Sequence, residues 1–265
     1  MIRNGPLALA FHAGLMVFML LPLVLVCLVS FTDQAFLSLP GWPLSLRWYR
    51  ALAANDDFLR AFRNSLWLGL LSATVAVALC TPAALAISRA GARGVGAVGV
   101  VLMSPLLVPH IVLGVALLRF FSALGLTASF AALVLAHVLV IMPYALQLVL
   151  TASFGTDARL EHAAMSLGAR PWTVLRRVTL PLLLPGIASG WLLAFLHSFD
   201  ELTMTLFLAS PGTTTLPVRI YLQIEDTIDP LVTSASTLLI IGALVVMILL
   251  DRLYGLDRLL AGKGA

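Results

Sequence analysis

Long apolar runs alternate with short polar segments along the whole chain. Each run holds about the twenty residues that an α-helix needs to cross the hydrocarbon core of a bilayer. The polar segments between the runs are too short for a separate soluble domain. The pattern therefore predicts an all-α membrane protein with one transmembrane domain over residues 1–265 and six spans, at about 7–31, 64–87, 96–118, 128–152, 181–208 and 231–250.

One polar segment, residues 153–180, has a pattern of its own. Ala163, Ala164 and Leu167 share one face at helical spacing, and Gly168 follows as a residue that tolerates positive φ and ends helices. Pro171 suits the first turn of a second helix. The segment predicts a short helix, a sharp turn and another helix between the fourth and fifth spans.

Composition supports a membrane protein. The chain is 61% hydrophobic and 11% charged, its mean hydropathy is +1.05, and about a quarter of the residues in a soluble protein are charged. The formal net charge of +4 indicates membrane orientation rather than nucleic-acid binding.

Basic residues favour a cytoplasmic amino terminus under the positive-inside rule. With six spans, this orientation also puts the carboxyl terminus and the 153–180 segment in the cytoplasm. The cytoplasmic segments then carry most of the sixteen basic residues, namely Arg3, Arg89, Arg93, Arg159, Arg170, Arg176, Arg177, Arg252, Arg258 and Lys263.

Residues for catalysis, nucleotide binding or metal binding are missing from the sequence pattern. The single lysine, Lys263, is followed only by Gly264 and Ala265, so the chain has no phosphate-binding G-x-x-x-x-G-K-[ST] loop. The histidines within the predicted spans do not share an i, i+4 spacing, and histidines in helical bundles more often form hydrogen bonds than bind metals. We therefore expect a non-catalytic chain with no cofactor or metal of its own.

The 153–180 segment resembles the EAA loop of the membrane subunits of ABC importers. In that loop an acidic residue and two alanines precede a glycine, and I-x-L-P follows nine residues after the glycine. Here nine residues separate Gly168 from Val178-Thr179-Leu180-Pro181. His162 stands directly before the alanine pair, with the acid one place earlier at Glu161.

The resemblance implies that residues 159–168 form a coupling helix in a groove of a partner ATPase. The alanines allow close approach, Glu161 and His162 make polar contacts at the rim, and Gly168 sets the angle to the next helix. The residues expected to dock are Glu161, His162, Ala163, Ala164, Leu167 and Gly168.

A second segment, residues 198–238, resembles the spermidine/putrescine-type permeases, specifically the subunit that pairs with a second, non-identical permease. The shared features are Phe199-Asp200-Glu201, Thr215-Leu216-Pro217 and Ser236-Thr237. The resemblance implies a type I ABC importer permease fold in a bacterial inner membrane. It also implies partners: a second permease, two ATPase subunits that bind ATP and Mg²⁺, and a periplasmic solute-binding protein.

Asp200 and Glu201 need a reason to lie near a membrane span, because a carboxylate at a helix centre costs about 2.5–3.5 kcal/mol on insertion scales. If the hydrocarbon part starts near Pro185, Asp200 lies roughly 22 Å along a core of about 30 Å, toward the outer face. Either the pair draws a polyamine or other cation into the pathway, or Asp200 has a structural role while Glu201 meets water. In that second case Asp200 caps the helix or pairs, for instance with Arg219 or with a neighbour on the other permease.

The leading hypothesis is a permease subunit of an ATP-driven importer of polyamines or a related small solute. Similar permeases serve opines, phosphonates and other solutes, so the cargo stays open. An ion-coupled secondary transporter would show an internal repeat and a midplane acid, and neither is evident. A membrane-embedded enzyme would carry paired His/Asp motifs on inward faces, which are also missing.

Overall fold

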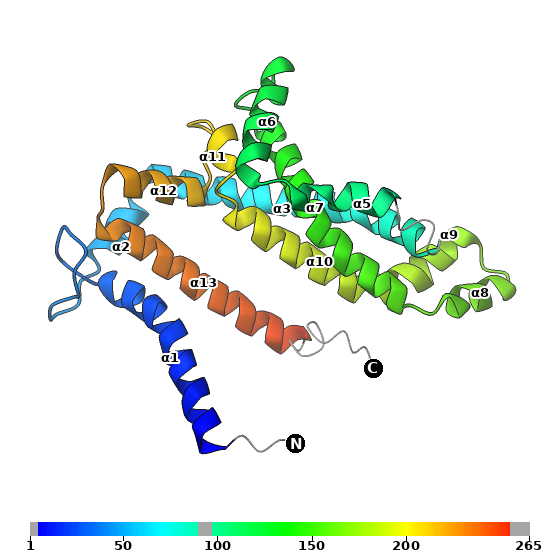
Figure 1. Cartoon of the computed structure of the whole chain (residues 1–265), viewed down its shortest axis with the longest axis horizontal. Helices are drawn as coiled ribbons and strands as arrows, with labels where there is room; N and C mark the ends of the chain where they lie inside the picture. The colour runs from blue at the N-terminus through cyan, green and yellow to red at the C-terminus, as the bar shows by residue number, and fades with distance from the viewer. Residues whose placement is uncertain (1–4, 90–96, 255–265) are drawn as a thin grey trace. The chain divides into compact units, whose positions relative to one another are not determined.

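The computed structural model describes residues 5–89 and 97–254, and the regular secondary structure of this part of the chain is all helical, without strands (Figure 1). Four of the basic residues used for orientation, Arg3, Arg93, Arg258 and Lys263, lie outside the described residues. The longest helices are α1 (Pro6–Val29), α3 (Asp56–Arg89), α7 (Phe130–Gly155), α10 (Leu180–Asp200) and α13 (Pro230–Tyr254).

Five helices in the described ranges are long and apolar enough to span a membrane, and a bent helix pair raises the number to six. The bent pair stands where we expected one span over 96–118. It consists of α5 (Ala97–Met103) with the 3₁₀ segment η1 (Ser104–Leu107), followed by α6 (His110–Ala123), and its two parts meet at 105°. Pro105 and Pro109 flank the bend, and proline cannot donate the hydrogen bonds of a continuous helix. The span expected over 96–118 is therefore a bent helix pair, interrupted where Pro105 and Pro109 lie.

The fifth predicted span, 181–208, also differs from the structure. Helix α10 stops at Asp200, and the backbone of Glu201 is extended with ψ 113°. The Glu201 carboxylate accepts a hydrogen bond from the backbone N–H of Met204, which stabilises a turn at this place. A separate short helix, α11 (Thr205–Leu208), follows. On its other side, α10 continues from α9 (Pro171–Val174) through the π-helical segment η2 (Leu175–Thr179).

The chain divides into two compact units. The first holds residues 1–60 and 219–256 and contains α1, α13 and the short helix α2 (Arg47–Ala53), with α13 packed on both of the others. The Ser234 hydroxyl donates to the Ser30 carbonyl. The amphipathic helix α12 (Leu216–Asp226) leads from the second unit into the first.

The second unit, residues 61–218, has its core between α3, α7 and α10. Helices α7 and α10 lie side by side in Figure 1, and small residues let them approach closely. A Cβ on Gly190 would lie 3.2 Å from the Ala145 carbonyl oxygen, and one on Gly186 would overlap the Ala152 Cβ. The helix α8 (Ala158–Ser166) and α9 lie together at one end of this unit.

Buried His137 confirms the expected structural role of a span histidine. It is fully buried on α7 and hydrogen-bonds Ser198 at 2.8 Å and Thr205 at 2.9 Å. These bonds join α7 to the end of α10 and to α11, so the imidazole holds three helices of the second unit together.

Candidate functional site: the coupling loop and the acidic end of α10

The predicted helix-turn-helix of the polar segment is present. The Asp157 side chain caps α8 by accepting from the Arg159 backbone N–H at 2.9 Å. Gly168 has φ +87°, its N–H donates to the Met165 carbonyl, and the N–H of Ala169 donates to the Ala164 carbonyl. These two bonds form a Schellman cap, whose left-handed residue favours glycine. Pro171 opens α9 at the first helical position.

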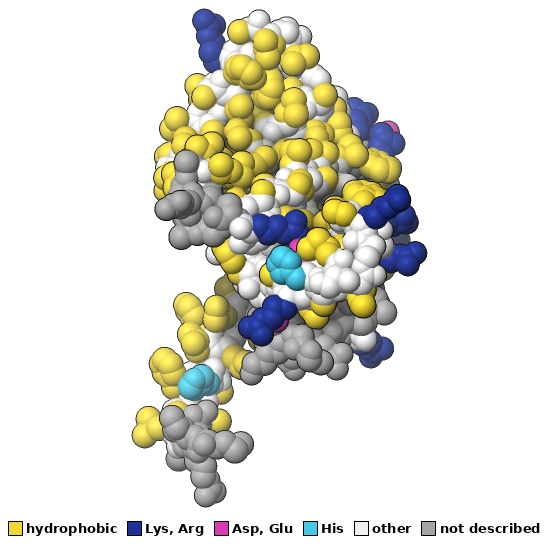
Figure 2. Space-filling view, turned by 90° about the vertical axis from the view of Figure 1, so that its right-hand side faces the viewer, with side chains coloured by type: hydrophobic (Ala, Val, Ile, Leu, Met, Phe, Trp, Pro, Cys, Tyr) yellow, Lys and Arg dark blue, Asp and Glu magenta, His cyan; other side chains and the backbone are white. Residues whose placement is uncertain are grey.

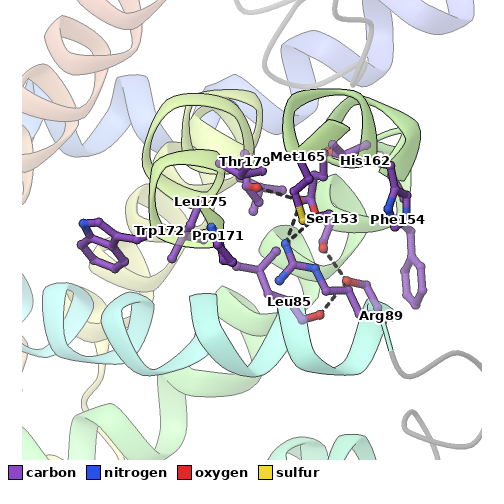
Figure 3. Close-up of a pocket in the computed structure, with 16 residues that line it drawn as sticks. Leu85, Arg89, Ser153, Phe154, His162, Met165, Pro171, Trp172, Leu175 and Thr179 are labelled. Atoms are coloured by element: carbon purple, nitrogen blue, oxygen red, sulfur yellow. Dashed lines mark hydrogen bonds and ion pairs between the residues drawn. The ribbon is translucent and has the colours of Figure 1, made fainter. Parts of the chain in front are cut away.

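Glu161 points inward from α8 and ties three elements together. One guanidinium nitrogen of Arg89 donates hydrogen bonds to both carboxylate oxygens of Glu161, at 2.7 and 2.9 Å. The Thr179 hydroxyl donates a third hydrogen bond to this carboxylate, at 2.7 Å. Arg89 ends α3 and Thr179 ends η2 (Figure 3). The Glu161 side chain is only 18% exposed. The structure therefore uses Glu161 inside the chain, where we had expected a contact at the rim of a partner.

The charge of Glu161 is stabilised by these partners. Partial burial disfavours the carboxylate, but the hydrogen bonds from Thr179 and Arg89 and the charge of Arg89 outweigh it and hold the pKa of Glu161 below its ordinary value. Because the folded-state pKa is lowered, the stabilisation exists above the ordinary pKa and is lost as the pH falls through the lowered one.

The Glu161→Gln variant tests this connection. The amide keeps the shape of the side chain but loses the charge that pairs with Arg89, so the attachment of α8 to α3 weakens. If α8 is the coupling helix that the resemblance implies, we expect the number of solute molecules moved per ATP hydrolysed to fall by about three- to ten-fold, as the loss of a charge-assisted hydrogen bond implies. Asp157→Asn is the matched control, because Asn also caps helices and Asp157 is 58% exposed. Equal ratios for both variants would contradict the role.

The remaining expected docking residues lie on the outer surface of α8 and its turn. His162, Ala163, Leu167 and Gly168 are exposed, and Ala164 is half-buried. Leu167 is 90% exposed, so its side chain is accessible to a partner, although a single exposed leucine does not by itself mark a binding surface.

Beneath α8 lies a pocket of about 800 Å³ between the α8–α9 segment and the ends of α3 and α7. Its lining includes Arg89, Glu161, His162 and Trp172, and a hydrogen bond of 2.6 Å between Ser88 and Ser153 closes one side (Figure 3). Basic side chains gather on the face of the molecule that includes this end, as Figure 2 shows. The exposed arginines of the loop are Arg159, Arg170, Arg176 and Arg177.

The two carboxylates at the end of α10 have different environments. Asp200 is exposed, whereas Glu201 is 8% exposed and binds His110 Nδ1 at 2.9 Å as well as the Met204 N–H at 2.6 Å. The alternative in which Glu201 meets water was therefore wrong. Its carboxylate instead fixes the turn after α10 and the start of α6. His110 is a functional neighbour that the sequence did not reveal, because 91 residues separate it from Glu201.

The pairing of Asp200 with Arg219 stays a prediction, since the two residues belong to different units. Within its own unit, Arg219 donates to the Gln223 side chain at 3.1 Å, and its guanidinium lies 5.4 Å from the centre of the Phe58 ring.

Comparison with known proteins places both regions in one family. Residues 81–256, which include the coupling loop and the α10 carboxylates, match the family model described as the binding-protein-dependent transport system inner membrane component. The chain belongs to this family. It is thus a multi-pass inner-membrane permease of an ABC importer, and ATP hydrolysis takes place on partner chains.

Two curated relatives of this permease show the range of the family. The spermidine/putrescine transport system permease protein PotC of Escherichia coli strain K12 is 30% identical over 254 residues, 96% of each chain. The molybdenum transport system permease protein ModB of Mycobacterium bovis is 36% identical over 241 residues, 84% of this chain and 91% of ModB.

A solved structure confirms the expected type I permease fold. A chain of a bacterial ABC transporter that imports the acidic polysaccharide alginate superposes with a TM-score of 0.77 over 94% of this permease and 95% of its own length. The two sequences are 16% identical, so the likeness concerns the fold alone.

Proposed function

We propose that this permease moves a polyamine such as spermidine or putrescine into the cell and that α8 is its coupling helix. Residues 1–265 act as one permease domain with both termini and the 153–180 loop in the cytoplasm. A second, non-identical permease completes the pathway, a periplasmic binding protein delivers the solute, and two ATPase subunits bind ATP and Mg²⁺. The observation that carries the proposal is the attachment of α8, through Glu161, to two membrane helices.

The coupling loop is suited to pass on movement from a partner. The Gly168 turn holds α8 and α9 at a set angle, and the partner-facing side chains of His162, Ala163 and Leu167 lie on the outside. The inward face is joined to α3 by Arg89 and to η2 by Thr179. A displacement of α8 in an ATPase groove would therefore move two membrane helices together.

The polyamine cargo is supported by the relationship to PotC and by the carboxylates at the end of α10. Negative charge attracts a polycation strongly at a site with few competing waters. Asp200 is exposed and free to meet a solute, whereas Glu201 supports the local structure. The relationship to ModB favours a second candidate, the import of a molybdenum oxyanion by the same mechanism.

Uptake by the complete transporter in proteoliposomes tests the proposal. The complex of this permease with its second permease, ATPase and binding protein should accumulate radiolabelled spermidine only when ATP is inside with the ATPase, and vanadate should stop it. Molybdate is the competing cargo. Accumulation of molybdate without spermidine would contradict the polyamine proposal, and accumulation of spermidine without ATP would contradict the role of the coupling helix.

A further inference from the structure

Five polar side chains interrupt the apolar surface of α7 and α10. Tyr144, Gln147 and Thr151 follow one another on α7 at i, i+3 and i+7, and His197 and Asp200 stand at i and i+3 on α10. Such spacing puts each set on one face of its helix. Gln147, Thr151, His197 and Asp200 are exposed, and Tyr144 is half-buried. We name these five residues the polar stripe.

The two halves of the polar stripe lie on the same side of the helix pair. The rings of Tyr144 and His197 are stacked, with centroids 3.9 Å apart and an angle of 17° between their planes. The opposite side of the pair is occupied by α3. There the Cys80 thiol donates to the Met142 carbonyl, and the Trp191 indole N–H donates to the Thr74 hydroxyl at 3.0 Å.

Most polar groups of the stripe have no partner in the described part of the chain. The Tyr144 hydroxyl, the Gln147 amide and the Asp200 carboxylate make no hydrogen bond there, and Thr151 donates only to the Gln147 carbonyl of its own helix. Hydrocarbon cannot satisfy such groups, and polar residues within spans almost always face a water-filled cavity or the interior of a bundle. The stripe therefore faces something other than lipid.

The charge of the stripe points to the kind of solute that passes it. Asp200 is the only charged residue of α7 and α10, and neither helix contains a lysine or an arginine. Stacked aromatic rings add a surface to which ammonium groups are attracted. An oxyanion would meet a carboxylate and no cation along these two helices.

We propose that the polar stripe is this subunit's wall of the translocation path and that it selects positively charged solutes, with the Tyr144 and His197 rings as the contact for ammonium groups. The proposal rests on the proposed transport function. It adds to that function the residues that line the path and the preference of the path for positively charged solutes. Tyr144, Gln147, Thr151 and His197 become specificity-determining residues together with Asp200.

Thiol accessibility in the assembled transporter tests the path directly. Cys27 and Cys80 are first replaced by Ala, and Gln147→Cys is introduced into this background. The reagents are 2-aminoethyl methanethiosulfonate, a cation, and 2-sulfonatoethyl methanethiosulfonate, an anion. The reaction rate with each reagent is divided by the rate of the same reagent with a small free thiol in solution. Leu135→Cys is the matched control, because Leu135 lies on the same helix, outside the stripe, and is 55% exposed.

We expect Gln147→Cys to react about ten-fold faster with the cation than with the anion, as the focused field of a carboxylate in a cleft implies. It should also react faster than Leu135→Cys, and spermidine should slow it. If Gln147→Cys reacts no faster than Leu135→Cys, lipid or the second permease covers the stripe and the inference is wrong. Equal normalised rates with both reagents would overturn the charge selection.

Uptake measurements separate this inference from the proposed function. Tyr144→Leu should raise the apparent KM for spermidine about five- to ten-fold, whereas Tyr144→Phe, which keeps the ring, should stay within about two-fold of the unchanged protein. Equal KM values for the two variants would overturn the role of the ring. If spermidine uptake is driven by ATP but Gln147→Cys does not react, the proposed function stands and the role of the polar stripe is contradicted. If Gln147→Cys reacts selectively with the cation but spermidine is not taken up, the polar stripe stands and the polyamine function is contradicted.

Discussion

Gly168→Val should lower ATP-driven uptake about ten-fold while the permease still inserts and assembles. Gly168 has φ +87° in the turn between α8 and α9, and a β-branched residue in this conformation costs about 1–3 kcal/mol. Among the described residues, apart from the chain neighbours, no atom lies within 4 Å of the position of the new Cβ, so the effect comes from backbone strain rather than from a clash. The strained turn relaxes, and the angle between the coupling helix and α9 changes. A ten-fold effect corresponds to about 1.4 kcal/mol.

The matched control for this experiment is Gly125→Val. Gly125 lies in the loop between α6 and α7, has φ +69°, and also has open space around its Cβ position. Both variants carry similar strain, but only the first changes the coupling loop. Uptake and ATPase activity are measured in the same proteoliposomes. A Gly168→Val transporter that moves as much solute per ATP as the Gly125→Val transporter would show that the turn angle is unimportant.

Gly186→Val should destabilise the second unit more than any change at an exposed glycine. The new Cβ would overlap the Ala152 Cβ and lie 3.3 Å from the Leu148 carbonyl oxygen, so α7 and α10 must move apart. Overpacking of this kind costs about 1–3 kcal/mol. We expect the thermal midpoint of the purified complex in detergent to fall by about 4–10 °C.

Gly242→Val controls for the change of residue type, since Gly242 is also helical and no atom of a described residue outside its own helix turn lies within 4 Å of its Cβ position. The thermal midpoint of the Gly242→Val complex should stay within about 2 °C of that of the unchanged protein. Equal midpoints for Gly186→Val and Gly242→Val would mean that the α7–α10 contact is looser than the structure shows.

Local chemistry explains which features the sequence predicted. The turn at Gly168 depends on one glycine, one proline and a spacing of alanines, all within twelve residues, so it could be read from the chain. Long apolar runs predicted the membrane helices in the same way. Pro105 and Pro109 were compatible with a bend after Leu107 but did not decide it, because prolines also occur within continuous membrane helices.

Pairs between distant residues could not be predicted. Glu161 meets Arg89, which is 72 residues away, and Glu201 meets His110, which is 91 residues away. Periodicity shows which face of a helix is polar but does not show which other helix that face meets. For this reason we expected Glu161 to contact a partner, whereas in the structure its carboxylate binds Arg89 and Thr179.

The continuity of α9, η2 and α10 has a mechanical consequence. From Pro171 to Asp200 the chain is helical over 30 residues, a length of about 45 Å at 1.5 Å per residue. A tilt of about 5° about the Pro171 end would shift the Asp200 end by about 4 Å. If α6 stayed in place, a shift of this size would break the 2.9 Å hydrogen bond between Glu201 and His110. Under the proposed function, a small rotation started at α8 would then release the turn that follows the other end of this helix.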